Sequence, residues 1–520
     1  MANSSSTNST GLRAVVAIPS VFDFYFTPHR FSCLGAKILY NLLSSNGIKP
    51  SLHVFPLDHS KSKVIDLPQE ISYLNDHIIR NETGKLSYFT KYQRFGPSAE
   101  ECAQLIIKES PDICFISSFA FSYSYEALSL AKHLKKIKPD LTIILGGAGP
   151  SAYPLYFIKD TNIDFVLVGE AEVSIKLFLD AFVYKTTGYG DVPNLYWKNE
   201  GIIRFNTPKV FSDSNQIDIF ISKTYETKKS ISFSTSLTRG CNKTCRFCSN
   251  FLTHGNTFRT IPLEKVNSAI KSFSSIENAE KKKIFINFED DNLLLDMEYF
   301  LNVLKSFKKS YPEILFLAEN GLDYSLLKPD VVKELVDLGL DKFNLSLASI
   351  DPAILEMEKR PMFLEHYKKI VATIAARNIP CITYFICGFK NDTKKSIARM
   401  LAFLANQPVT IGISLFYPVP GIHGFENMEI FDKLPPFCCN GASAYPWNQS
   451  LSTSTLITAF RLSRFVNLQK QKIKSEIETK ILKMIQENRK LYTFEKVHKN
   501  IEIIPVKNSD QELVEEFFNA

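Results

Sequence analysis

Three cysteines, Cys241, Cys245 and Cys248, carry the most distinctive chemistry in this chain. They stand at CxxxCxxC spacing in the stretch LTRGCNKTCRFCS, and Phe247 directly precedes the third of them. Three thiolates on one short loop can each hold one iron of a [4Fe–4S] cluster and leave the fourth iron open to a ligand. The spacing therefore predicts a cluster with one reactive iron.

A structural zinc site and ordinary buried thiols are the two alternatives. A structural zinc site uses four ligands, commonly as two CxxC pairs, and the sequence holds only the pair Cys245 and Cys248. Cysteine is also often buried as a small apolar residue. The neighbours Arg239, Asn242 and Lys243 are polar, however, and are not typical of a core. The cluster is the favoured hypothesis, which its structural context must confirm.

Length and composition predict a multidomain globular protein. A chain of 520 residues is too long for a single core. Hydrophobic residues make up 45% of the chain and charged residues 22%, which is ordinary for a globular protein. The net charge of +7 arises from 61 basic against 54 acidic side chains, so we expect a solvated surface and no nucleic-acid partner.

Neither a targeting signal nor a membrane span is expected. The opening MANSSSTNST lacks a basic start and an apolar run and predicts a disordered tail. No apolar run approaches the roughly 20 residues that cross a bilayer. Ten cysteines without a secretory segment favour a reducing, cytoplasmic location.

Strand-length apolar runs alternate with helical stretches in the first third of the chain. Strands are expected at 13–19, 51–57, 112–119, 141–145 and 164–168, and helices at 34–45, 123–137 and 172–182. This alternation predicts an α/β domain with a doubly wound, flavodoxin-like parallel sheet that binds ligands at the carboxyl ends of its strands. Residues 60–96 form a polar insertion, either a lid or a surface excursion.

Small residues follow three of these expected strands. They are Ser117 and Ser118, Gly146 and Gly147, and Gly169. Glycine lets a ligand approach the backbone closely, but glycine turns occur in most α/β proteins. Ligand binding and tight turn geometry both remain open on the residues alone.

A second series of strands and helices begins after residue 229. Strands are expected at 232–237, 283–288, 314–317, 342–347, 381–386 and 410–415, with helices between them. Six such units predict a partial (β/α)6 barrel, whose chemistry belongs on the loops at the carboxyl ends of its strands. The three cysteines occupy the loop after the first of these strands.

Changes from patterned to Gly-, Asn- and Lys-rich sequence divide the chain into five parts. We expect a disordered tail at 1–11, a ligand-binding sheet domain at 12–185, a linker with a small hairpin at 186–229, the barrel at 230–425, and a cap with a helical C-terminal region at 426–520. Within the last part, the apolar and basic positions of 456–490 predict one or two amphipathic helices.

The cysteine motif, with an aromatic residue before its third cysteine, resembles the CxxxCxΦC signature of radical S-adenosylmethionine (SAM) enzymes. This resemblance implies that the open iron binds the amino and carboxylate groups of SAM and that Phe247 lies near the adenine. It also implies that an electron from the cluster cleaves SAM to methionine and a 5′-deoxyadenosyl radical, which abstracts hydrogen from an unactivated carbon.

The same resemblance assigns SAM contacts to the loop after the second barrel strand. There Glu289, Asp290 and Asp291 are implied to hold the SAM amino group. Acids at a strand end are also frequent helix caps, and Asp296 is a further candidate for that role. The structural alternative therefore stays open for these acids.

Further SAM contacts are implied after the third and fourth strands: Asn320, Ser346, Ser349 and Arg360. Many relatives carry Glu at the position of Ala348, where this chain departs from the pattern. The hydrogen-bonding role of that Glu then falls to Asn320, Ser346 or Ser349, and the sequence does not say which.

Residues 11–185 resemble the cobalamin-binding domain that is joined to one large group of radical SAM enzymes. The contacts implied for cobalamin are Ser117, Ser118, Gly146, Gly147 and Gly169, with Gly146 and Gly147 beside its nucleotide tail. The chain lacks the DxHxxG string that supplies a histidine ligand to cobalt. His29 lies in the corresponding loop without the Asp or the Gly, so no histidine ligand is expected.

The resemblance as a whole implies a radical SAM enzyme that uses a [4Fe–4S] cluster, SAM and cobalamin to methylate an unactivated carbon. Oxidative cyclisation or rearrangement is the alternative reaction, and a cobalamin or cluster sensor without turnover is a different class. We expect a small-molecule or peptide substrate and an electron donor such as flavodoxin or ferredoxin. The sequence does not identify the substrate.

Overall fold

The computed structural model describes residues 11–28, 31–58, 61–77, 88–89, 91–210, 214, 217–273, 282–476 and 509–520. These residues belong to two compact units, each built from separate segments of the chain. The first unit takes them from Met1–Asp66, Tyr92–Ile284 and Val419–Phe437, and the second from Leu67–Lys91, Phe285–Pro418 and Cys438–Ala520.

A seven-stranded sheet forms the centre of the first unit, in the order β10-β9-β8-β7-β6-β1-β3. Its strands are β1 (Arg13–Ile18), β3 (Lys49–Val54), β6 (Ile113–Ser117), β7 (Thr142–Gly146), β8 (Phe165–Leu167), β9 (Leu195–Asn199) and β10 (Ile202–Phe205). The five strands from β8 to β3 pair in parallel, whereas β9 and β10 are antiparallel. The α/β class with parallel strands is therefore confirmed.

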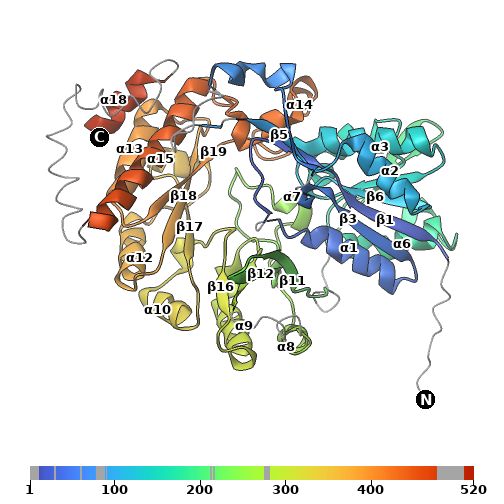
Figure 1. Ribbon diagram of the computed structural model, residues 1–520, viewed down its shortest axis with the longest axis horizontal. Helices are drawn as coiled ribbons and strands as arrows, with labels where there is room; N and C mark the ends of the chain where they lie inside the picture. Colours follow the sequence, from blue (N-terminus) through green and yellow to red (C-terminus); the bar gives the residue numbers. More distant parts are fainter. Residues whose placement is uncertain are drawn as a thin grey trace. The chain divides into compact units, whose positions relative to one another are not determined.

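Helices cover both faces of this sheet (Figure 1). They are α1 (Leu34–Ser45) and α6 (Ala171–Phe182) on one face, and α2 (Ala99–Lys108) and α3 (Ser124–Ile137) on the other. Fully buried Val16, Phe115 and Phe178 belong to the core between α1, α6 and the sheet. This two-sided burial explains why the central strands β1, β6, β7 and β8 are mostly apolar runs.

The polar insertion that follows β3 forms strands at both of its ends. β4 (Lys63–Ile65) and β5 (Tyr92–Phe95) pair antiparallel, and β5 also pairs with β2 (Val21–Asp23), which gives the order β2-β5-β4. Between them, Gln69–Asp76 forms a 3₁₀ helix that belongs to the second unit. The described part of this insertion thus contains two strands and a 3₁₀ helix.

The remaining strands of the first unit frame the cysteine loop. β11 (Ser222–Glu226) pairs antiparallel with β12 (Ser230–Thr235), and β13 (Thr238–Arg239) pairs antiparallel with β14 (Arg259–Thr260). The helices of this part are α4 (Ala148–Ala152), α5 (Pro154–Ile158), α7 (Phe251–His254), α8 (Leu263–Lys271) and α14 (Glu429–Lys433). The cysteines lie between β13 and α7.

Parallel strands also build the second unit. β15 (Lys283–Phe288) pairs with β16 (Leu315–Leu317), and β18 (Cys381–Cys387) pairs with both β17 (Phe343–Ala348) and β19 (Thr410–Leu415). Single parallel bridges from Phe316 to Leu340 and from Leu322 to Leu345 link the two groups. The helices are α9 (Met297–Ser310), α10 (Pro329–Asp337), α11 (Pro352–Met357), α12 (Leu364–Ala376), α13 (Lys394–Ala405), α15 (Thr453–Glu476) and α18 (Gln511–Asn519).

No helix in the described part of the chain is long and apolar enough to cross a membrane. The cytoplasmic location stays a prediction from the sequence. The helical C-terminal region expected at 456–490 coincides with α15 as far as Glu476, and residues 477–490 lie outside the described residues.

Candidate active site and cofactor-binding edges

The cysteine loop runs from Gly240 to Phe258 between two short paired strands. In the ladder of β13 and β14, Thr238 faces Thr260 and Arg239 faces Arg259. Gly240 has φ +75°, and a Cβ there would lie 2.3 Å from the carbonyl oxygen of Thr257. Glycine is therefore required where the chain enters the loop.

All three predicted cluster ligands are half-buried thiols on this loop, and no disulfide joins any cysteine of the chain. The backbone turns tightly there, with Cys248 N donating to Cys245 O at 3.2 Å. Among the described residues, no three His, Cys, Asp or Glu side chains converge on a position for a single metal ion. Each thiolate of a [4Fe–4S] cluster holds a different iron. Half-buried Phe247 lies on the same loop.

A carboxylate from the sheet domain contacts the end of the cysteine loop. Glu170, directly after β8, accepts hydrogen bonds from Nη1 and Nη2 of Arg259 at 2.9 and 3.0 Å, and its Oε1 lies 2.9 Å from Nδ1 of His254. Burial alone would raise the pKa of Glu170, but the hydrogen bonds and charges of His254 and Arg259 outweigh it and hold this pKa below its usual range. Glu170 is therefore an ionised, buried partner of the loop.

The two glycines of the turn after β7 differ in whether turn geometry or ligand approach explains them. Gly147 has φ +106°, and a Cβ there would lie 2.7 Å from Ser118 O, so tight packing of the turn already requires this glycine. At Gly146 a Cβ would meet only Leu167 O, at an ordinary 3.5 Å. Since neither strain nor crowding explains Gly146, its missing side chain fits the close approach of a ligand to the carboxyl edge.

The other predicted cobalamin contacts lie on the same edge. Ser118 is buried and its Oγ donates to Ala120 O at 3.2 Å, so this hydroxyl serves the turn, whereas Ser117 is half-buried at the end of β6. Gly169 has φ +69°, and its N donates to Ser151 Oγ at 2.8 Å. The predicted contacts therefore lie at the carboxyl ends of β6, β7 and β8, which are neighbouring strands of one sheet edge.

The cysteine loop packs against this edge inside the first unit. α7, which follows the last cysteine, lies against α4, which follows Gly147. The segment after β19 joins them, since a Cβ on Gly421 would lie 3.5 Å from Leu252 of α7 and 3.6 Å from Ala152 O of α4. Tyr153 Oη donates to the Asp432 carboxylate at 3.0 Å, which links α14 to the residue that follows α4. One compact unit thus brings the thiols and the predicted cobalamin edge together.

The acids after β15 lie at the strand end, and they do not cap the next helix. Asp290 is only 4% exposed, whereas Glu289 and Asp291 are half-buried. The cap of α9 is Asp296, whose Oδ1 accepts from Tyr299 N at 3.0 Å. Asp296 therefore fills the role of helix cap. The buried Asp290 carboxylate remains a candidate to bind a cationic ligand.

The structure brings Ser346 and Arg360 together at the end of β17. Arg360 Nη2 donates to Ser346 O at 3.0 Å and lies 3.4 Å from Asp323 Oδ1. Asn320 is exposed after β16, and Ser349 is buried with its Oγ accepting from Asp351 N at 3.1 Å. Ser349 therefore supports the turn into α11, whereas Ser346 and Arg360 form the more direct candidate contact.

Ala348 marks the end of β17 with an unusual backbone. Its φ is +66°, and the register between β17 and β18 shifts between Ser346 and Ala348. Such a conformation at a residue other than glycine costs about 1–3 kcal/mol and is concentrated at functional sites.

His29 lies in the loop where relatives carry the DxHxxG string, and it is outside the described residues.

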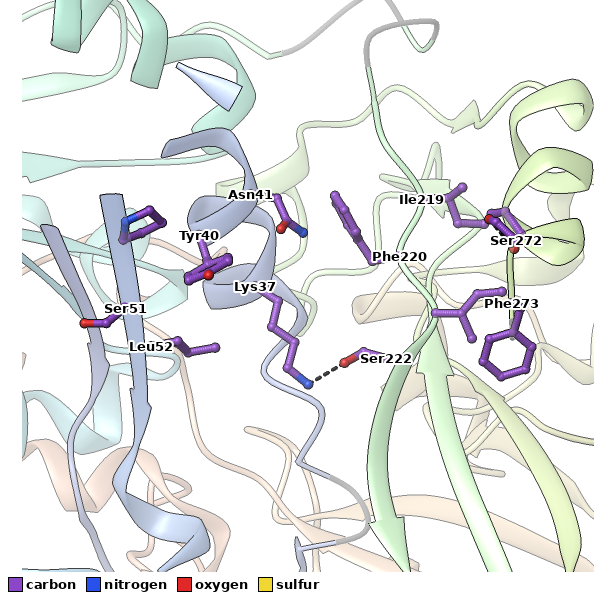
Figure 2. A pocket seen from close by; sticks show the side chains of 13 residues that line it. Lys37, Tyr40, Asn41, Ser51, Leu52, Ile219, Phe220, Ser222, Ser272 and Phe273 are labelled. Atoms are coloured by element: carbon purple, nitrogen blue, oxygen red, sulfur yellow. Dashed lines mark hydrogen bonds between the residues drawn. The ribbon is translucent and has the colours of Figure 1, made fainter. Parts of the chain in front are cut away.

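A pocket of about 720 Å³ lies elsewhere on the first unit. Figure 2 shows Lys37 of α1 pointing to Ser222, to whose Oγ it donates a hydrogen bond. The pocket is lined by the first half of β3 and by α1, α8 and 219–222, and it contains no predicted contact of the cluster, SAM or cobalamin. It is therefore separate from the candidate site.

Comparison with known proteins identifies the domains. Residues 235–404 match the family model of the radical SAM superfamily, and residues 90–179 match the model of the B12 binding domain. The cysteine loop therefore lies in the radical SAM domain, and the glycine turn lies in the B12-binding domain.

The chain is similar to several known proteins, among them two curated relatives and one solved structure. Bacteriochlorophyllide d C-12(1)-methyltransferase of Chlorobaculum tepidum is 28% identical over 194 residues, which is 37% of this chain and 41% of the relative. An uncharacterized methyltransferase of Pyrococcus horikoshii is 24% identical over 335 residues, 63% of this chain and 71% of the relative. The structure of the radical SAM methyltransferase TsrM from Kitasatospora setae has a TM-score of 0.57 at 14% identity, over 81% of this chain and 76% of that one.

Residues 235–404 therefore form a radical SAM domain. A B12-binding domain lies on its amino-terminal side, at residues 90–179. These domains imply a [4Fe–4S] cluster, SAM and cobalamin as its cofactors. The match spans less than half of the bacteriochlorophyllide methyltransferase, and 14% identity to TsrM establishes the fold alone.

Glu170, His254 and Arg259 have no role that the sequence pattern predicts. Their contacts join positions 84 and 89 residues apart, which no local pattern reveals. Two features of the sequence could have pointed to them. Glu170 directly follows the strand-end glycine Gly169, and Arg259 follows the cysteine motif by 11 residues.

Proposed function

We propose that this protein is a cobalamin-dependent radical SAM methyltransferase that transfers a methyl group to an unactivated carbon of a small-molecule or peptide substrate. The observation that carries the proposal is the packing of α7, next to the cysteine loop, against α4 of the B12-binding edge within one compact unit. Methyl transfer to a carbon radical needs the two cofactors near one substrate. The methyltransferase activity of the relatives supports the same reaction.

When bound, the cluster supplies the electron that cleaves SAM and the corrinoid supplies the methyl group. The chain's part is to bind and orient. Cys241, Cys245 and Cys248 are the thiolate ligands, and the buried Asp290 offers a carboxylate to the SAM ammonium group. Arg360, near the end of β17, offers a guanidinium to the SAM carboxylate.

The remaining predicted contacts belong to the same proposal. For SAM they are Phe247, Glu289, Asp291, Asn320, Ser346 and Ser349, and for cobalamin they are Ser117, Ser118, Gly146, Gly147 and Gly169. Among the latter, Gly146 has the best support, because its missing side chain leaves room at the strand edge. Ser118 and Ser349 have the least, because their hydroxyls serve their own turns.

The finer architecture is also part of the proposal. The parallel strands of the B12-binding domain follow the order β3-β1-β6-β7-β8, which supports a flavodoxin-like arrangement. Parallel pairing among β15 to β19 supports a partial (β/α)6 barrel that begins with β12. We keep the division into 12–185, 186–229, 230–425 and 426–520, with flavodoxin or ferredoxin as the electron donor.

Mass spectrometry of SAM products tests the reaction. The protein is reconstituted anaerobically with iron, sulfide and hydroxocobalamin and is given SAM and a reductant. S-adenosylhomocysteine together with 5′-deoxyadenosine supports methyl transfer. 5′-Deoxyadenosine alone indicates cyclisation or rearrangement, and the absence of both indicates a protein without turnover.

The spectrum of the cobalamin tests its binding mode. Because the DxHxxG string is absent, we expect Co(II) without a nitrogen ligand, and its electron paramagnetic resonance signal then shows no nitrogen splitting. Splitting that disappears in His29→Ala assigns His29 as a ligand and contradicts this expectation.

A further inference from the structure

Two arginines lie opposite each other where the cysteine loop begins and ends. Arg239 and Arg259 are cross-strand partners in β13 and β14, and their side chains are 11% and 6% exposed. Like charges directly opposite each other destabilise a strand pair, and a buried charge without a counter-charge is costly. The stem of the loop therefore needs buried negative charge.

Glu170 supplies that charge from the B12-binding domain. Its side chain is 3% exposed and forms the two-pronged bond to Arg259, while Arg239 Nε lies 4.0 Å from Oε1. Arg239 has a second carboxylate of the same domain beside it, since Glu172 Oε1 lies 3.8 Å from its Nη2. The buried Glu170 carboxylate thus lies beside both arginines, and Glu172 is a further counter-charge for Arg239. Both acids come from outside the domain of the arginines.

The same carboxylate also holds the helix inside the loop. His254, the last residue of α7, faces Glu170 through Nδ1, and its carbonyl oxygen accepts from Arg259 Nη2 at 2.9 Å. Glu170 therefore contacts the entry, the helix end and the exit of the loop that carries the three thiols. A bidentate bond fixes direction as well as distance.

Glu170 is tied to the predicted cobalamin turns by a short series of hydrogen bonds. The preceding Gly169 donates its N–H to Ser151 Oγ, and Ser151 Oγ donates to Gly147 O, both at 2.8 Å. The turns after β7 and β8 and the Glu170 carboxylate thus form one connected piece of structure.

We propose that Glu170 is a positioning residue through which the B12-binding domain fixes the cluster-binding loop. The inference rests on the proposed function only in taking that loop as the cluster site. Beyond the proposed function, the inference makes the B12-binding domain part of the cluster site. The domain holds the loop stem whether or not cobalamin is bound.

Hydrogen exchange of the protein without cluster or cobalamin tests this role directly. Glu170→Gln keeps the shape and removes the charge, and we expect the amides of 240–258 to exchange at least about tenfold faster. Peptides from β6 and β7 should be unchanged. Glu109→Gln is the matched control, because Glu109 pairs with His53 at 2.5 Å in the same domain and should leave 240–258 unaffected.

A second variant covers the case in which Glu170→Gln does not fold. Glu170→Asp keeps the charge but shortens its reach, so exchange in 240–258 should rise by less while the sheet stays protected. After reconstitution, the iron content should fall in the order wild type, Glu170→Asp, Glu170→Gln. Folded Glu170 variants with wild-type exchange in 240–258 and wild-type iron content overturn the proposal.

The proposed function fails by a different result. If the wild-type protein takes up no iron and sulfide, the cluster assignment is wrong, whereas exchange in the cluster-free protein still decides the role of Glu170. The two failures are therefore distinguishable in the same set of samples.

Discussion

Arg360 reaches back across 14 residues to donate a hydrogen bond to the backbone oxygen of Ser346 at 3.0 Å. Its guanidinium also lies 3.4 Å from the buried Asp323 carboxylate. The resemblance to radical SAM enzymes implied that both residues contact SAM at the fourth strand edge. Their meeting at the end of β17 gives this edge a fixed cation.

Replacing Arg360 with Lys should weaken SAM binding without unfolding the protein. Lys keeps the charge but loses the planar fork, so we expect the KM for SAM to rise roughly tenfold. Arg377→Lys is the control, because Arg377 pairs with Asp337 on an exposed surface at 2.7 Å. An unchanged KM in Arg360→Lys contradicts the assignment.

Asp290 and Asp296 should respond differently to substitution. Asp290→Asn removes the buried charge proposed for the SAM ammonium group. Because a hydrogen bond to a charged group contributes about 1.5–3 kcal/mol, the Kd for SAM should rise about ten- to a hundredfold. Asp296→Ala removes the cap of α9 and should cost about 0.5–2 kcal/mol of stability with SAM affinity retained. Calorimetric titration and thermal unfolding of both variants separate these roles, and equal SAM affinity in Asp290→Asn and wild type argues against a contact.

The glycine turn offers a matched pair of substitutions. Gly147→Ala should lower stability by about 1–3 kcal/mol, because of its positive φ and the 2.7 Å approach to Ser118 O. Gly146→Ala should leave the Tm nearly unchanged but weaken cobalamin binding about tenfold, since a methyl group forced against a ligand costs about 1–3 kcal/mol. Cobalamin titration and thermal unfolding check both, and unchanged cobalamin affinity in Gly146→Ala leaves that glycine as a turn residue only.

Much of the fold could be predicted from local pattern. The expected helix 34–45 and the strands 283–288 and 410–415 coincide with α1, β15 and β19. In these segments hydrophobic periodicity and residue preference agree with the packing. The helix α2 was missed although Ser98 and Glu101 form a capping box, a signal that the sequence contains.

Other features depend on contacts that local pattern does not contain. Strands β9 and β10 lie where a linker hairpin was expected, and they extend the first sheet because β9 pairs with β8. The left-handed backbone of Ala348 and the approach of Glu170 to Arg259 are likewise set by tertiary packing. Residue types at strand ends pointed to the site, but they could not specify which side chains meet.

The stability of the protein should depend on pH through Glu126. Burial raises the pKa of this carboxyl group from 4.5 to about 8, and the nearby Asp23 charge adds to the effect. Because the folded-state pKa lies above the unfolded one, the folded chain keeps a proton that the unfolded chain loses. This contribution is complete below the unfolded pKa and is lost as the pH rises through about 8.

Glu126→Gln should flatten this dependence. Between about pH 5 and pH 8 the wild type should lose more unfolding free energy than the variant, by an amount on the order of a few kcal/mol. Chemical denaturation at several pH values measures the difference, with exposed Glu100→Gln as the control. Parallel curves for wild type and Glu126→Gln contradict the assignment.

The central claim is that Cys241, Cys245 and Cys248 hold a cluster that cleaves SAM, and substitution of each cysteine tests it most directly. Iron content, visible absorption and 5′-deoxyadenosine are measured after anaerobic reconstitution of the wild type and of each single Cys→Ala variant. Cys438→Ala is the control, because Cys438 is buried in the second unit. We predict that each of the three variants loses the cluster and all SAM cleavage while Cys438→Ala keeps both. Full iron content and full cleavage in any one of the three would contradict the account.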